Sequence, residues 1–387
     1  MKTTLCIYFL LSMLLFGCAN PQKNEIPTQN PDFASITPNI KATSPVVNTP
    51  VQIAACAYLD DVAKSKFDFV GEIVIKDDDR LSLCNLKTGT RQLIPDTENS
   101  LYFTVSFSPD YKRFSYINFS NDLVIVSTLG EKQIIGLQED VGSWAMDWLN
   151  DKEISFVLPT RDDGSMTVYN IDTGEFQQVI TNIEDINNLD PISWYSGAIP
   201  VTILDPSLSR LIYLSYDLPS IGGHGFVMMD WETHSVLWQR AGIIGAKPAW
   251  TPDGNFAAIA INSTKSDRIY IVNREGEEAD IIDFENDYPD AVVLAQNMKW
   301  SPDGKRLGFI SKFFSDKQEK EILFVYDLQS KTSNKFEIGY PSRIIWSPDG
   351  SQILVNGYLI NIATNQRFEL MNSDEGFEPL GWLQPMP

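Results

Sequence analysis

The sequence predicts an all-β protein, a seven-bladed β-propeller in which each blade is a four-stranded antiparallel sheet. The first observation is a repeated segment, Trp-Ser/Thr-Pro-Asp-Gly, which stands at Trp250, Trp300 and Trp346 with an apolar strand on either side. Weaker copies of this segment begin at Phe107, Trp148 and Leu204, and a last tryptophan stands at Trp382. The second observation is their spacing of 36 to 56 residues, which is typical of propeller blades.

The third observation is the order of strands and turns within one repeat. In the turn at residues 301–304, proline sets φ, aspartate bonds the local backbone, and glycine supplies a positive φ. After the strand that ends at Trp300, we expect strands at residues 306–311, 322–327 and 334–338. Short polar turns with glycine recur between the last two strands of other repeats, as tight hairpins require.

The two ends of the repeat region complement each other. The first blade begins at residues 70–75 without an inner strand, and residues 379–383 form a strand without a blade. We therefore expect the C-terminal strand to complete the first blade, because this closure removes both open sheet edges. Six blades is the alternative, since the copy at Leu204 is the least regular.

The Trp-Ser-Pro-Asp-Gly copies resemble the repeats of the TolB-like propellers, a branch of the WD-repeat-like family. This resemblance implies the fold and leaves the activity open, because such repeats occur in translocation accessories, peptidases, lyases and binding modules. The separate α/β domain that precedes the propeller of TolB has no counterpart here, because residues 19–66 are too few and too rich in proline.

The N-terminus predicts export and lipid attachment. Lys2 precedes an apolar run at residues 5–16, which is too short to span a membrane. The following Gly17-Cys18 resembles the lipobox of bacterial lipoproteins, which implies cleavage after residue 17 and acyl chains, palmitate among them, on Cys18. Several acyl chains hold a protein stably on a membrane.

Four segments follow from these features. We expect a signal peptide at residues 1–17, a disordered proline-rich tether at 18–50, a lead-in segment at 51–66 and the propeller at 67–387. The lipobox predicts a protein of the cell envelope that lies outside the cytoplasm and is lipid-anchored at the outer membrane or the cell surface. We expect a monomer.

Charge narrows the class of partner. The chain has 30 Lys and Arg against 51 Asp and Glu, a formal net charge of -21. A nucleic acid is excluded as partner, because phosphate binding needs clustered lysine and arginine.

The cysteines fit an exported protein. Cys6 leaves with the signal peptide and Cys18 carries lipid, so Cys56 and Cys84 remain as a candidate disulfide. Two unpaired buried thiols are the alternative.

Few residues suit catalysis. The chain has only two histidines, His224 and His234, which we expect at opposite ends of one strand. The common hydrolase, zinc-protease and nucleotide-binding motifs do not occur in the sequence. We expect no catalytic residue, no cofactor and no metal, because the acidic stretches fit turns better than a calcium loop.

Binding is instead expected on the face that carries the long loops, here called the top face. Long loops on a rigid scaffold are where ligands usually bind. The candidate binding residues are Trp144, Asp162, Asp163, Trp194, Tyr195, His224 and Tyr288.

The predicted function is binding without catalysis, of a protein, peptide or glycan in the cell envelope. The alternative is an extracytoplasmic hydrolase or lyase that uses carboxylates as acid and base on a glycan or peptide. A structural propeller with contacts on its bottom or side is a third possibility.

Overall fold

The computed structural model divides the chain into two compact units, Met1–Thr37 and Pro38–Pro387. Only residues of the second unit are described below. They are residues 41, 42, 52, 53, 56–66, 69–78, 80–98, 100, 101, 104–137, 146–158, 165–180, 203–215, 218, 224–262, 267–284, 288, 292–314, 319–338, 343–355, 357–371 and 378–384. Within them, no helix is long and apolar enough to cross a membrane.

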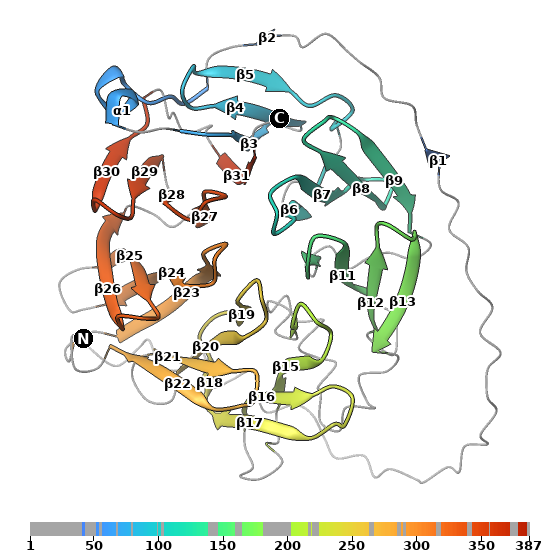
Figure 1. Ribbon diagram of the computed structural model, residues 1–387, viewed down its shortest axis with the longest axis vertical. Coiled ribbons are helices and arrows are strands. Elements are labelled where there is room, and N and C mark those ends of the chain that lie inside the picture. Colours follow the sequence, from blue (N-terminus) through green and yellow to red (C-terminus); the bar gives the residue numbers. More distant parts are fainter. Residues whose placement is uncertain are drawn as a thin grey trace, which may run out of the picture. The chain divides into compact units, whose positions relative to one another are not determined.

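The described strands of the second unit form seven antiparallel sheets, which Figure 1 shows arranged in a ring. The predicted seven-bladed propeller is therefore confirmed, and the six-bladed alternative is wrong. Each sheet is one blade, and its strands follow one another outward from the innermost, as the repeat pattern predicts. Blade 4, which holds the weak copy at Leu204, is a complete four-stranded sheet like its neighbours.

The blades are numbered here in chain order, and each is given from its inner strand outward. Blade 1 contains β31 (Glu378–Leu383), β3 (Glu72–Asp77), β4 (Arg80–Asn85), β5 (Thr90–Leu93) and β2 (Gln52–Ile53). Blade 2 contains β6 (Ser106–Phe107), β7 (Arg113–Ile117), β8 (Asp122–Ser127), β9 (Lys132–Gly136) and β1 (Lys41–Ala42). Blade 3 contains β10 (Asp147–Trp148), β11 (Glu153–Leu158), β12 (Ser165–Asn170) and β13 (Glu175–Ile180). Blade 4 contains β14 (Ile203–Leu204), β15 (Arg210–Ser215), β16 (Gly225–Asp230) and β17 (Val236–Ala241).

The last three blades carry the regular copies of the repeat. Blade 5 contains β19 (Ala249–Trp250) and β18 (Ile243–Ile244), which both pair with β20 (Phe256–Asn262), then β21 (Asp267–Asn273) and β22 (Glu278–Asp283). Blade 6 contains β23 (Val292–Trp300), β24 (Arg306–Phe314), β25 (Glu319–Asp327) and β26 (Thr332–Ile338). Blade 7 contains β27 (Ile345–Trp346), β28 (Gln352–Val355), β29 (Tyr358–Asn361) and β30 (Gln366–Glu369).

The C-terminal strand closes the ring as predicted. β31 pairs antiparallel with β3, so the innermost strand of blade 1 comes from the far end of the chain (Figure 1). The indole of Trp382 donates a hydrogen bond to the Val70 carbonyl at 2.9 Å. Gly381 has to be glycine here, because a Cβ at this position would meet the ring of Phe107 at 2.0 Å.

The Ser/Thr-Pro-Asp-Gly turns share one hydrogen-bond pattern. In blade 6 the Ser301 hydroxyl donates to the Asp303 carboxylate at 2.6 Å and accepts from the Arg306 amide at 3.0 Å. The glycine after the aspartate has φ of 67° at Gly304, and Tyr111 in the weak copy of blade 2 has φ of 59°. The weak copy of blade 2 therefore folds into the same turn, although a side chain stands where glycine would be unstrained.

Short segments before the first blade extend its edge. β2 pairs with β5, and the helix α1 (Asp61–Lys66) follows, with the Ala63 amide donating to the Asp60 carboxylate at 2.6 Å. β1 pairs with β9, so residues 41 and 42 of the predicted tether form a strand rather than an unstructured segment. Most of the tether and the whole predicted signal peptide lie outside the described residues.

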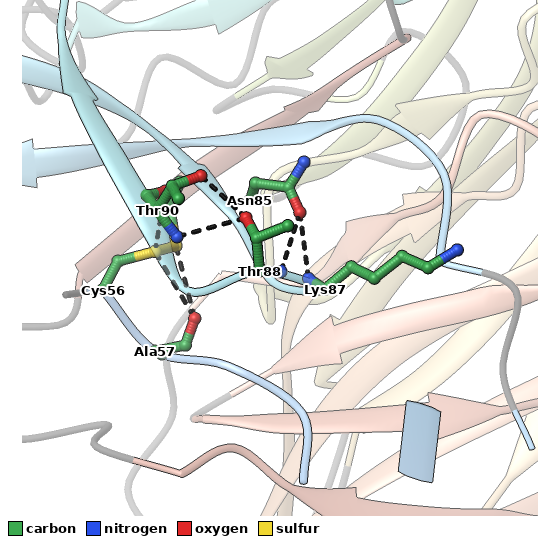
Figure 2. The surroundings of a disulfide bond; sticks show 7 residues. Cys56, Ala57, Asn85, Lys87, Thr88 and Thr90 are labelled. Atoms are coloured by element: carbon green, nitrogen blue, oxygen red, sulfur yellow. Dashed lines mark hydrogen bonds between the residues drawn. A yellow bond between two sulfur atoms is a disulfide. The ribbon is translucent and has the colours of Figure 1, made fainter. Parts of the chain in front are cut away.

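A disulfide ties this lead-in segment to blade 1. It joins Cys56 to Cys84 of β4, with 5.9 Å between their Cα atoms (Figure 2). The neighbouring turn is held by Asn85, whose side-chain oxygen accepts from the amides of Lys87 and Thr88 at 3.0 and 3.2 Å. The bridge lies in a buried cluster that also contains Leu359 of blade 7.

Candidate functional site

A cavity among the described residues lies along the inner strands of blades 2 to 6. We call it the channel cavity; its volume is about 670 Å³. A volume of that size suits a small ligand or one end of a larger one. Aromatic side chains from four blades contribute to its wall, namely Phe107, Tyr111, Trp148, Trp250 and Trp300. Its charged lining residues are Asp147, Lys247 and Lys299.

The alternation of β23 explains which residues reach the channel. Met298 and Trp300 are 9% and 4% exposed, whereas Asn297, directly before Met298, and Lys299, between the two, are exposed. Successive side chains of a strand point to opposite faces, so one set packs between blades and the other faces the channel. Lys299, directly before the motif tryptophan of blade 6, is therefore a channel position, whereas Ile345, directly before Trp346, is 4% exposed and packs in the core.

A β-bulge interrupts β23 immediately before this position. Gln296 pairs with Ile310 and Lys299 with Gly308, so β23 holds one residue more than β24 over this stretch. Asn297 takes up the extra residue with φ of 49°, a left-handed conformation that asparagine tolerates better than most residues. Bulges of this kind redirect side chains near binding sites.

Motif tryptophans fix the inner strands to one another. The Trp300 indole donates to the Ala249 carbonyl at 2.9 Å, and the Trp346 indole donates to the Lys299 carbonyl at 3.0 Å. In both cases the acceptor is the backbone carbonyl of the residue directly before the motif tryptophan of the preceding blade. The Trp250 indole N–H differs, since it is buried and has no hydrogen-bond partner among the described residues.

An ion pair crosses the cavity between blades that are not neighbours. The Lys247 ammonium of blade 5 donates to the Asp147 carboxylate of blade 3. Blade 4 lies between these two blades in the ring (Figure 1). This pair is electrically neutral and occupies the one carboxylate among the lining residues that the structure describes.

Lys299 has a different environment. Its ammonium has no ion pair, hydrogen bond or ring contact among the described residues. Nearby protein atoms in the channel desolvate its ammonium in part, and this desolvation lowers its pKa from the ordinary value. Asp147 partly opposes the shift, whereas Arg343 and Lys247 add to it by repulsion between like charges.

Two of the candidate binding residues predicted from the sequence are described. His224 is exposed directly before β16, and its carbonyl accepts a hydrogen bond from the Gly242 amide at 2.9 Å. Tyr288 packs against Phe313 with 4.5 Å between ring centroids, and its hydroxyl lies 3.2 Å from the Lys335 ammonium. Tyr288 therefore belongs to the packing of blade 6, and His224 to the edge of blade 4.

The other candidate residues lie outside the described residues. These are Trp144, Asp162, Asp163, Trp194 and Tyr195.

Sequence reasoning missed the charged residues of the channel. Asp147 and Lys299 stand one residue before Trp148 and Trp300, and Lys247 stands three residues before Trp250. The positions one and three before the motif tryptophan thus hold the charged lining residues of three blades, so the repeat alignment itself carried this signal.

Metal chemistry has little support in this part of the chain. Among the described residues, no group of three or more His, Cys, Asp or Glu is placed to hold a metal ion. The cavity combines aromatic walls, one neutral ion pair and one lysine without a partner, an arrangement that can hold an anionic or polar group.

Comparisons with known proteins support the fold. A scan against protein-family models finds no match for this chain, and a search of the curated proteins finds none either. Among solved structures, an oligogalacturonate lyase in complex with manganese is similar, with a TM-score of 0.50 and 12% identity. The match covers 78% of this chain and 86% of that chain. At this identity the likeness shows the propeller fold alone.

Two further solved structures are similar at lower TM-scores. A putative TolB from Agrobacterium tumefaciens has a TM-score of 0.43 at 14% identity, covering 73% of this chain and 96% of that chain. The Cps50 (Swd1) β-propeller domain from Myceliophteria thermophila has a TM-score of 0.45 at 11% identity, covering 84% and 99%.

Proposed function

We propose that this protein is a binding propeller of the bacterial cell envelope, held at a membrane by lipid on Cys18. Its ligand is a peptide, a glycan or part of a protein, which enters the channel cavity and contacts the top-face loops. The observation that carries the proposal is the channel cavity of about 670 Å³, with aromatic walls and a lysine that has no partner among the described residues. Envelope location rests on the lipobox-like Gly17-Cys18.

Catalysis is the second candidate function. An oligogalacturonate lyase shares the fold, and a carboxylate-dependent hydrolase or lyase would need two carboxylates converging on a substrate. Within the described part of the cavity, Asp147 is the single lining carboxylate and is already paired with Lys247. The cavity therefore supports binding better than acid and base catalysis.

Fractionation of cells that express the full chain tests the anchor. We expect the wild-type protein in the membrane fraction and Cys18→Ser in the soluble extracytoplasmic fraction, because the variant cannot be acylated. Equal membrane recovery of both proteins would contradict lipid anchoring.

Capture from envelope extract tests binding. The full chain, immobilised from detergent, is expected to retain a glycan, peptide or protein that the same chain unfolded in urea does not retain. A second comparison uses the charge-reversed variant Asp162→Lys/Asp163→Lys. Unchanged capture by this variant would contradict a role for the top-face loop, and conversion of the ligand to a product would favour the enzyme.

A further inference from the structure

We propose that Lys299 forms an oxyanion site in the channel cavity that takes a carboxylate or phosphate group of the ligand. The inference rests on the proposed binding function and deepens it by naming the charge of the ligand. The ligand is expected to carry a negatively charged group, although the chain as a whole is strongly negative.

The lack of an acidic partner at Lys299 is the first step. The chain has 51 acidic and 30 basic residues, so a lysine or arginine would readily find a carboxylate. The Lys299 ammonium has no ion pair, hydrogen bond or ring contact among the described residues, although it lines the cavity. An exposed ammonium that lines a cavity and has no protein partner is open to an anionic group of a ligand.

The charges around Lys299 are the second step. Three charged side chains act on it: Asp147, Lys247 and Arg343. The pair between Asp147 and Lys247 cancels, so Lys299 gives the described lining of the cavity a net positive charge. An oxyanion placed there would gain charge-assisted hydrogen bonds from the Lys299 ammonium.

Preorganisation is the third step. The Lys299 carbonyl accepts the Trp346 indole at 3.0 Å, and its backbone pairs with Gly308 of β24. The bulge at Asn297 sets the direction of β23 just before Lys299. A site whose backbone is fixed in advance loses little freedom when a ligand binds, which raises affinity.

The cavity also limits the kind of ligand. At about 670 Å³ the channel cavity admits a small molecule or the end of a chain, while Trp300 and Phe107 offer apolar wall. A ligand with one anionic group and a less polar body fits this wall. The anionic group is either the carboxylate of an acidic sugar or peptide end, or a phosphate.

Calorimetric titration of the full chain in detergent tests the site. The probes are inorganic phosphate for one source, and N-acetylglycine, with neutral N-acetylglycinamide as its match, for the other. We expect at least one anion to bind the wild type and Lys299→Met to bind it at least about 10-fold more weakly, or about 1.4 kcal/mol. The amide is expected not to bind.

Matched variants separate a local effect from a general one. Lys320→Met removes the same charge from β25 of the same blade, where Lys320 pairs with Glu337 and is 49% exposed, and it should bind as the wild type does. Lys299→Arg should retain most of the affinity. If Lys299→Met melts at a lower temperature than the wild type, Lys299→Gln provides the same comparison.

The pH dependence gives a second readout. Protonated Lys299 binds the anion, so affinity should be constant at neutral pH and fall as pH rises through the lowered pKa of this lysine. That fall should occur below the ordinary lysine value of about 10.4 and should be missing in Lys299→Arg.

Three outcomes would overturn the inference. They are failure of both anions to bind the wild type, equal binding by Lys299→Met, and capture of an uncharged envelope ligand that Lys299→Met retains equally. The last result would leave the binding function standing. Anion binding at Lys299 without any capture from the envelope would instead overturn the proposed function alone.

Discussion

The two faces of β23 differ in burial and in the contacts that their side chains make. On the face between blades, Met298 and Trp300 are almost fully buried, and Trp300 bonds to the backbone of blade 5. On the channel face, Asn297 and Lys299 are exposed, and the lysine has no partner among the described residues. Neighbouring residues of one strand thus separate stability from binding.

The same division holds in the adjacent blades. The motif tryptophan recurs at Trp250, Trp300 and Trp346, while the residue before it changes from Ala249 to Lys299 to Ile345. The repeated tryptophan holds the blades together, whereas the residue before it varies from the cavity-lining Ala249 and Lys299 to the buried Ile345. A propeller can therefore change its ligand without changing its fold.

The largest predicted effect comes from the buried face. Trp346→Ala should lower the free energy of unfolding by about 3–5 kcal/mol, because Trp346 is 1% exposed and the substitution leaves a cavity. Urea denaturation measures this loss. The channel-face variant Lys299→Met is the comparison, and an equal loss in both would erase the distinction between the faces.

Removal of the disulfide, which belongs to blade 1, should have the second largest effect on stability. Cys56→Ser/Cys84→Ser opens a loop closed across a sequence separation of 28 residues, which should cost about 3 kcal/mol. Denaturation of the oxidised wild type, the reduced wild type and the double variant measures it. Anion binding by the folded double variant should be unchanged, since the bridge belongs to blade 1.

Substitution of the buried Asp267 should change the stability of the protein in a pH-dependent way. Asp267 is fully buried, and burial raises its pKa, although its carboxylate accepts the Ala295 amide at 2.6 Å. Because its pKa is higher in the folded state, ionisation favours unfolding as pH rises above the unfolded value. Asp267→Asn should therefore stabilise the protein by about 1 kcal/mol or more at pH 7, and this gain should vanish near pH 3.

Thermal melts of Asp267→Asn and wild type across this pH range measure the gain. A variant that is less stable at pH 7 would show that the ionised carboxylate is needed at this position.

The smallest effect concerns the turns. Gly350 has φ of 68° and room for a Cβ, whose nearest neighbour would be the Pro302 Cδ at 3.5 Å. Gly350→Ala should therefore cost only the strain of a left-handed alanine, about 1 kcal/mol. Gly136→Ala in β9, where φ is ordinary and the nearest atom is 3.7 Å away, is the control in urea denaturation and should change little.

Much of the fold could be predicted from the sequence. Tryptophans at a regular spacing and the turns after them predicted seven blades and the closing strand β31, because both depend on local patterns. The weak copies remained harder to recognise, since Tyr111 and Leu208 adopt φ of 59° and 58° where the regular turns have glycine. Only tertiary packing compensates for that strain.

The candidate site was harder to predict. Long loops directed attention to the top face, and five of the seven candidate residues there lie outside the described residues. The charged channel positions Asp147, Lys247 and Lys299 are single residues in an otherwise repetitive pattern. Their convergence depends on the ring, which brings blades 3, 5 and 6 around one cavity.

Crystals of the full-length protein soaked in selenate would test the central claim most directly, because anomalous scattering locates the anion without reference to affinity. Selenate stands in for the carboxylate or phosphate oxygens of the ligand. The account predicts an anomalous peak in the channel cavity, with an oxygen within about 3 Å of the Lys299 Nζ. Peaks confined to lysines and arginines on the outer surface, with none beside Lys299, would contradict it.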